Sequence, residues 1–155
     1  MRGKYFLDTN ILIYTVSNVI SKKEIAVGLL SKNAVISTQV ISESANVMHR
    51  KLNFDYPRIR RITDKFAEEN TLRIITHRTI RIALDIAERY GYSYYDSQVI
   101  ASALENTCGI LYSEDLQHSQ SQSPKARKNA LRKPANSLLA EVSVFIISEY
   151  SLISV

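Results

Sequence analysis

The chain has 155 residues and only one cysteine, Cys108. A single thiol cannot form a disulfide within the chain, and without companion cysteines it does not indicate a zinc site. The sequence also lacks a helical pair of metal-binding histidines, a Gly-rich phosphate loop and a G-x-S-x-G nucleophile elbow. The sequence therefore carries none of these motifs for metal binding, phosphate binding or acyl transfer. Cys108 is therefore predicted to be a small apolar side chain in or beside a strand.

Long apolar runs are absent as well. Runs such as 144–147 are far shorter than the ~20 residues that span a bilayer, and the N-terminal residues lead into a run too short for the core of a signal peptide. We therefore expect a cytoplasmic protein. With 45% apolar residues, a chain of this length is expected to form one globular domain with a genuine core.

The net charge of +5 resembles the signature of a nucleic-acid-binding protein, but it is unevenly distributed. Residues 116–140 contain five basic side chains and no acidic one, so the rest of the chain carries no net charge. A second basic stretch, 50–65, includes Arg50 and Lys51. Its side chains are expected either to contact phosphates or to form a solvated helix face.

Short apolar runs alternate with longer segments of helical periodicity. Strands are predicted at 5–8, 34–37, 72–76 and 109–112. Helices are predicted at 11–16, 22–31 with Ser21 as its cap, 38–51, 57–69, 77–90 and 94–106. This alternation is typical of an α/β domain with a mainly parallel sheet. Beyond it, 119–134 is polar and basic and is expected to be flexible or partly disordered, whereas 136–155 is compatible with a strand, a helix or a docked extension.

Two acidic residues follow predicted strands. Asp8 ends the first apolar run and Asp115 follows the fourth, where Glu114 makes the assignment ambiguous by one residue. Each has an ordinary alternative role as a capping or loop acid. Because ligands of open α/β sheets bind beyond the carboxyl ends of the strands, near the point where strand order reverses, a shared position there favours a functional role.

Two further acids lie on apolar helix faces. Glu43 falls in the same stripe as Val40 and Val47, and Asp96 continues the face of Val99 and Ile100. A carboxylate in such a stripe faces protein or a cleft and requires a cation, a salt-bridge partner or a metal. Asp96 also fits the simpler role of a first-turn acid that favours the helix dipole. Clustered carboxylates at a sheet edge suit Mg²⁺ or Mn²⁺, and the pattern suggests a metal-dependent nuclease.

Four motifs in order carry a resemblance to a known family. They are Phe6-Leu7-Asp8-Thr9-Asn10-Ile11-Leu12, Ser42-Glu43, Tyr94-Tyr95-Asp96-Ser97 and Leu111-Tyr112-Ser113-Glu114-Asp115-Leu116-Gln117-His118. Together they resemble the motifs of PIN-domain ribonucleases, and most of all the VapC-like toxins of type II toxin–antitoxin systems. The resemblance covers roughly 4–118. It divides the chain into a PIN-like nuclease domain, 1–118, and an atypical C-terminal extension of the same domain, 119–155, which reflects either a frameshift or a lineage-specific addition.

The resemblance implies a three-layer α/β/α sandwich, RNA cleavage that depends on Mg²⁺ or Mn²⁺, homodimerisation, and inhibition by a cognate antitoxin protein. Carried over by motif, Asp8, Glu43, Asp96 and Asp115 become the catalytic and metal-binding acids. Thr9, Asn10 and Ser113 are expected to support them. Arg50 and Lys51 are candidate RNA contacts.

Two rival functions stay open at this level. A non-catalytic PIN-fold protein that binds RNA or serves as a scaffold is compatible with the altered C-terminal segment. A receiver-like phosphotransfer domain would use Asp8 as a phosphoacceptor, but it explains neither Glu43 nor Asp96 on helix faces. Metal-dependent RNA cleavage separates the nuclease from the first rival, and an acyl-phosphate assay tests the second.

Overall fold

The computed structural model describes residues 3–114, 116, 143–147 and 152–154. Their elements in chain order are β1 (Tyr5–Leu7), α1 (Thr9–Val16), α2 (Ile20–Leu29), β2 (Ala34–Ser37), α3 (Thr38–Leu52), α4 (Tyr56–Glu69), β3 (Thr71–Arg73), α5 (His77–Tyr90), α6 (Tyr94–Glu105), β4 (Ile110–Tyr112), β5 (Ser143–Ile147) and β6 (Leu152–Ser154). The predicted alternation of strands and helices is confirmed.

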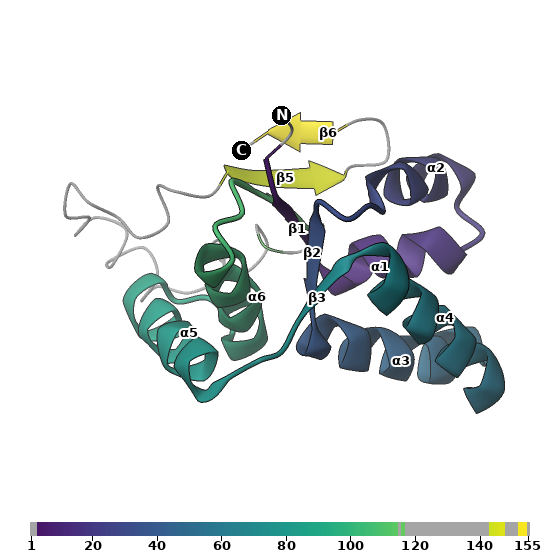
Figure 1. The fold of residues 1–155 in the computed structure, drawn as a ribbon. Helices are drawn as coiled ribbons and strands as arrows, with labels where there is room; N and C mark the ends of the chain where they lie inside the picture. The colour runs from purple at the N-terminus through teal and green to yellow at the C-terminus, as the bar shows by residue number, and fades with distance from the viewer. Residues whose placement is uncertain (1–2, 115, 117–142, 148–151, 155) are drawn as a thin grey trace.

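The strands form one sheet in the order β3-β2-β1-β4-β5-β6. All neighbouring strands are parallel except β5 and β6, which are antiparallel. Figure 1 shows α5 and α6 on one side of the sheet and α1 to α4 on the other, so the fold is the predicted three-layer α/β/α sandwich with a mainly parallel sheet. The chain places β2 and then β3 on one side of β1, and it later places β4 on the other side of β1. The strand order therefore reverses between β1 and β4, where open α/β sheets bind ligands.

The inner strands are buried because helices cover both faces of the sheet. All residues of β1 and β2 are buried, including Phe6, Leu7 and Ile36, which explains why their sequences are continuous apolar runs rather than alternating ones. Cys108 is also buried, as predicted, and burial raises the pKa of its thiol to about 11. None of the helices in the described part of the chain is long and apolar enough to cross a membrane.

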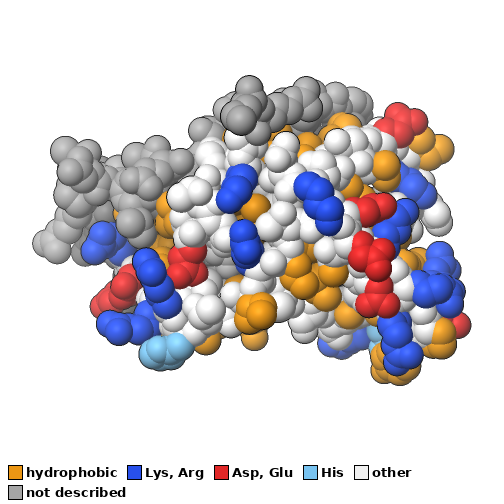
Figure 2. All heavy atoms as spheres, in the orientation of Figure 1, with side chains coloured by type: hydrophobic (Ala, Val, Ile, Leu, Met, Phe, Trp, Pro, Cys, Tyr) orange, Lys and Arg blue, Asp and Glu red, His pale blue; other side chains and the backbone are white. Residues whose placement is uncertain are grey.

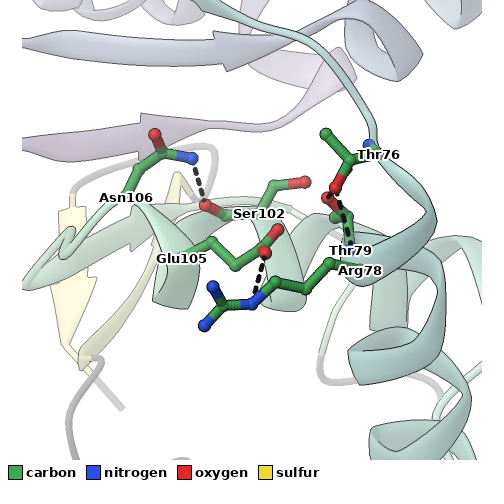
Figure 3. Close-up of polar contacts among 6 residues, drawn as sticks. All are labelled: Thr76, Arg78, Thr79, Ser102, Glu105 and Asn106. Carbon is green, nitrogen blue, oxygen red and sulfur yellow. Dashed lines mark hydrogen bonds and ion pairs between the residues drawn. The ribbon is translucent and has the colours of Figure 1, made fainter.

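The connection into α5 and α6 shows how local polar contacts set element boundaries. The predicted strand 72–76 ends at Arg73, because Thr76 serves instead as the N-cap of α5. Its hydroxyl accepts from the backbone N–H of Thr79, and the Thr79 hydroxyl accepts from the backbone N–H of Thr76, forming a capping box (Figure 3). At the other end, Gly91 closes α5 with a φ of 77°.

Helix α6 packs beside α5 as the second half of a helical hairpin. Arg78 of α5 forms an ion pair with Glu105 of α6 at 3.4 Å, and the Asn106 side-chain amide donates to the Ser102 carbonyl at 2.8 Å near the end of α6 (Figure 3). These contacts lie at the C-terminal end of α6. The first turn of α6, at the other end, carries Asp96.

Helix α2 begins earlier than the sequence predicts. Ser21 was expected to cap α2, but α2 begins at Ile20 and its N-cap residue, Val19, makes no side-chain capping bond. This prediction was wrong because the helix extends two residues further towards the N-terminus than the apolar periodicity indicated. Of the three alternatives for 136–155, the strand is the one observed over 143–147 and 152–154. The polar segment 119–134 lies outside the described residues.

Candidate functional site

Asp8 lies directly after β1 and is the N-cap of α1. Its Oδ1 accepts a hydrogen bond from the backbone N–H of Thr9 at 2.6 Å, and its Oδ2 accepts from the Ser113 hydroxyl at 2.6 Å. Ser113 follows β4, so this contact connects the carboxyl ends of two neighbouring parallel strands. Asp8 therefore performs its ordinary capping role and also lies at the point where the strand order reverses.

Asp8 is only 8% exposed, and this burial raises the pKa of its carboxyl from 3.8 to about 6. The hydrogen bonds from Ser113 and Thr9 lower the pKa, because they stabilise the ionised form. The negative charges of Glu43 and Asp96 raise it. Three of the predicted acids thus interact electrostatically although they come from three different elements.

Glu43 extends from α3 towards the start of α1. Its Oε2 accepts from the Thr9 hydroxyl at 2.9 Å, and its Oε1 accepts from the Gln39 side-chain amide at 2.8 Å. The sequence predicts that this carboxylate needs a cation, a salt-bridge partner or a metal beside it. Within the part of the chain that is described, its hydrogen-bond partners are a neutral hydroxyl and a neutral amide, and no salt bridge to Glu43 is found.

Gln39 is a site residue that the sequence analysis did not identify. Its Nε2 donates to Glu43 and also to the backbone carbonyl of Tyr95 at 3.2 Å, so one amide group joins α3 to the first turn of α6. Both partners are acceptors, and they fix which end of the amide faces them. Gln39 could have been identified from the sequence, because a spacing of four residues places it on the same helix face as Glu43.

Asp96 is half-buried in the first turn of α6, and its backbone N–H donates to the hydroxyl of Ser93, the N-cap of that helix, at 3.2 Å. Asn10 is half-buried in the first turn of α1. Asp115 lies outside the described residues, so its place in the site stays a prediction.

Glu114, the other acid after β4, has structural partners. One carboxylate oxygen accepts from the Tyr14 hydroxyl, and the other forms an ion pair with Lys22. The Lys22 ammonium lies 4.7 Å from the centre of the Tyr14 ring and 3.1 Å from its hydroxyl. These contacts attach the segment after β4 to α1 and α2, and they explain a charged residue at this position without a catalytic role.

Arg50 and Lys51 are exposed in the last turn of α3. Seven residues separate Glu43 from Arg50, which places them roughly 10 Å apart along the helix axis. On the face drawn in Figure 2, Lys and Arg side chains are scattered and interspersed with acidic ones rather than gathered into one patch. The charges of Glu43 and Asp96 therefore act on Asp8, whereas Arg50 and Lys51 lie further along α3.

A groove of about 710 Å³ adjoins Glu43, and we refer to it as the polar groove. Its lining includes Gln39, Ser42, Glu43, Ile75, Tyr95 and Gln98. It runs between the N-terminal half of α3 and the first turns of α6, on the side of the site where Gln39 bridges the two helices. Of the described acids of the site, Glu43 therefore faces a groove large enough for a bound molecule.

The residues present fit a hard divalent cation by their chemistry. Their donors are carboxylate and hydroxyl oxygens, which Mg²⁺ and Mn²⁺ prefer, and a cation would offset the charge that raises the pKa of Asp8. Among the described residues, which do not include Asp115, no three His, Cys, Asp or Glu side chains are assembled at metal-binding distances. The fit therefore rests on the donor types and on the electrostatics of Asp8.

The chain belongs to the PIN domain family, whose model matches residues 5–121. This range includes Asp8, Glu43, Asp96 and Asp115, which are the residues that carried the resemblance in the sequence. No functionally curated protein matches the chain.

Solved structures of similar fold include three from toxin–antitoxin systems. A toxin–antitoxin complex from Klebsiella pneumoniae has a TM-score of 0.63 at 14% identity, covering 95% of this chain and 98% of the other. VapC20 of Mycobacterium tuberculosis, a toxin that cleaves the sarcin–ricin loop, has a TM-score of 0.59 at 14% identity, covering 79% and 98%. VapBC2 of Rickettsia felis, bound to a DNA fragment from its promoter, has a TM-score of 0.56 at 19% identity, covering 78% and 93%. The fold of this chain is therefore VapC-like.

Proposed function

We propose that this protein is a metal-dependent endoribonuclease and the toxin of a toxin–antitoxin pair. The observation that carries the proposal is the buried Asp8 carboxylate at the reversal point of the sheet, on which the charges of Glu43 and Asp96 act. A helix cap alone does not require two further carboxylates whose charges raise the pKa of the capping residue. The family match and the toxins of similar fold support the same function.

In this proposal, Asp8, Glu43, Asp96 and Asp115 hold Mg²⁺ or Mn²⁺. A cation held by these residues would supply Lewis-acid chemistry, lowering the pKa of a water molecule and offsetting charge on the scissile phosphate. Ser113 and the Thr9 backbone keep Asp8 ionised and oriented, whereas the Thr9 hydroxyl and Gln39 orient Glu43. Arg50 and Lys51 contact the RNA backbone further along α3.

The direct test measures cleavage of single-stranded and hairpin RNAs by the purified chain with Mg²⁺, Mn²⁺ or EDTA. Asp8→Asn and Asp96→Asn should abolish metal-dependent cleavage while the circular dichroism spectrum stays native. Asp85→Asn is a suitable control, because Asp85 is an exposed acid on α5. RNA binding without cleavage by the wild-type chain would favour the non-catalytic alternative, and cleavage undiminished in both acid variants would refute the site.

An antitoxin partner has a suitable surface on the opposite side of the sheet from α5 and α6. A second groove of about 610 Å³ lies among α1, α2 and α4, and its lining includes Val16, Val27, Leu30, Ile62 and Phe66. An apolar groove between helices accepts an amphipathic segment of a partner. Val27 is about half exposed there, so Val27→Glu should weaken capture of a co-expressed antitoxin and leave RNA cleavage intact.

Homodimerisation is part of the same proposal and rests on the resemblance to VapC-like toxins. Light scattering of the purified chain across a dilution series measures it directly. A mass of about 35 kDa, twice the 17.6 kDa of one chain, is the expected result. A monomer at all concentrations would contradict this part of the proposal and leave the nuclease assignment untouched.

A further inference from the structure

The polar groove beside Glu43 has a lining that differs in chemistry from a phosphate-binding surface. Apart from Glu43, its polar side chains are neutral amides and hydroxyls, among them Gln39, Ser42 and Gln98. Within the described residues, neither Lys nor Arg lines it. Because no Lys or Arg offsets the negative charge of Glu43, the groove repels a phosphate. The groove therefore suits an uncharged molecule with hydrogen-bonding edges.

Tyr95 adds an aromatic surface to this groove. Its side chain is 63% exposed although it is large and apolar, and it belongs to the first turn of α6, directly before Asp96. The neighbouring ring of Tyr94 lies 5.4 Å away, centre to centre, at an interplanar angle of 63°, and this edge-to-face contact helps to orient Tyr95. An exposed aromatic ring beside neutral hydrogen-bonding groups is the combination that holds an unpaired nucleobase.

Hydrogen bonds of one side chain link the groove to Glu43 of the acidic site. Gln39 donates both to the Tyr95 carbonyl, at 3.2 Å, and to the Glu43 carboxylate, at 2.8 Å. Movement of the first turn of α6 away from α3 would break the first of these bonds. A base held on Tyr95 would therefore be positioned relative to Glu43, as selection of one phosphodiester bond requires.

We infer that the polar groove is a nucleobase pocket, in which one unpaired base of single-stranded RNA stacks on Tyr95 while the adjoining phosphate lies at the acidic site. The inference rests on the proposed function and adds a structural basis for positioning the substrate. The volume of about 710 Å³ falls within the range of small-molecule pockets. The pocket requires an unstacked base, so it excludes continuous duplex RNA and selects loops and single strands.

The test combines tyrosine variants with RNAs that lack single bases. Tyr95→Leu removes the aromatic surface and Tyr95→Phe retains it. Tyr56→Leu is the matched control, because Tyr56 is 65% exposed at the start of α4, outside the polar groove. Binding of a short fluorescent RNA is measured by anisotropy in the presence of EDTA. Cleavage of the same RNAs is measured separately with Mg²⁺ or Mn²⁺.

The expected loss for Tyr95→Leu is roughly 5- to 150-fold in affinity and in kcat/KM, which corresponds to the stacking of one base. Tyr95→Phe and Tyr56→Leu should stay close to wild type. An abasic substitution in the RNA should weaken binding and cleavage by the wild-type protein by a similar factor, at one position of the RNA only. Binding and cleavage by Tyr95→Leu should be insensitive to that substitution. This double dependence on the ring and the base distinguishes stacking from a loss of folding.

Two outcomes overturn the inference. The first is wild-type affinity for Tyr95→Leu, and the second is a loss that is equal for intact and abasic RNAs at every position. If the wild-type chain binds RNA with this dependence but never cleaves it, the proposed nuclease function fails while the nucleobase pocket stands. If it cleaves RNA and Tyr95→Leu cleaves equally well, only the pocket fails.

Discussion

The Ser113 hydroxyl donates a hydrogen bond to Oδ2 of Asp8 at 2.6 Å, across 105 positions of sequence. Both residues follow parallel strands that are neighbours in the sheet, so the pairing of β1 with β4 brings them together. The bond partly opposes the effect of burial on the pKa of Asp8. Of the described side chains, Ser113 therefore lowers the pKa of Asp8 the most.

Ser113→Ala is expected to shift the acidic limb of the pH–activity profile to higher pH. The variant loses a donor to a buried carboxylate, so the pKa of Asp8 should rise further above about 6. Removing a hydrogen bond to a charged group should also lower the free energy of unfolding at pH 8 by ~1–3 kcal/mol. Ser102→Ala is the control: it loses a buried hydrogen bond to the Gln98 carbonyl on α6. An equal shift of the profile in both variants would contradict this role of Ser113.

Asp8→Asn is expected to unfold at higher denaturant concentration than the wild type at pH 8 without divalent metal. The folded protein binds the Asp8 proton more tightly than the unfolded chain, so the contribution of Asp8 to stability is fully present below pH 3.8 and is lost as the pH rises through about 6. The difference in pKa corresponds to about 3 kcal/mol. Urea unfolding of both proteins at pH 4.5 and pH 8 measures it, and a stability difference that does not change with pH would count against a buried, ionisable Asp8.

Metal dependence should itself change with pH. A proton on Asp8 competes with a cation for the same oxygens, so half-saturation with Mg²⁺ or Mn²⁺ should require more metal below about pH 6 than at pH 8. Titrations of cleavage rate against metal at several pH values give this quantity. The metal should also raise the melting temperature of the wild type but not that of Asp8→Asn. A half-saturating concentration that is constant from pH 5 to pH 8 would exclude Asp8 as a ligand.

Gln39→Met is expected to lower kcat more than it raises KM. Methionine fills a similar volume but donates no hydrogen bond, so both Glu43 and the Tyr95 carbonyl lose a partner. We expect a decrease in kcat of roughly tenfold or more, because misplacement of a ligand by about 1 Å is costly in catalysis. Asn106→Ala is the matched control, since it removes an amide-to-carbonyl hydrogen bond at the far end of α6. Similar melting temperatures with unequal kcat values would support the positioning role.

Glu114 and Asp115 should respond differently to the same substitution. Glu114→Gln removes the ion pair with Lys22 and should reduce stability by ~1 kcal/mol while cleavage continues. Asp115→Asn should reduce cleavage without a comparable loss of stability. Melting temperatures and cleavage rates of the two variants resolve which acid after β4 belongs to the site. The reverse pattern would assign the catalytic role to Glu114.

Several features of the fold were predictable from local sequence. Helix α5 has the predicted bounds, because its apolar face, its capping residues and Gly91 are all local signals. Strand β2 was also predicted with its observed bounds. Helix α2 was less well predicted, since it starts at Val19 and Ile20 without a capping side chain to mark it. The short strand β3 was misplaced because Thr76 resembles a strand residue until its bond to Thr79 is seen.

The sequence by itself determined the alternation of strands and helices and the presence of acids after strands or on apolar helix faces. Spacing along one chain segment encodes these properties. Tertiary structure alone decided that Ser113 contacts Asp8, that Thr9 contacts Glu43, and that Gln39 joins α3 to α6. These contacts span 34 to 105 residues and depend on the strand order, which brings the ends of β1 and β4 together where the sheet reverses. Local periodicity contains no information on that order, because it follows from how whole elements pack.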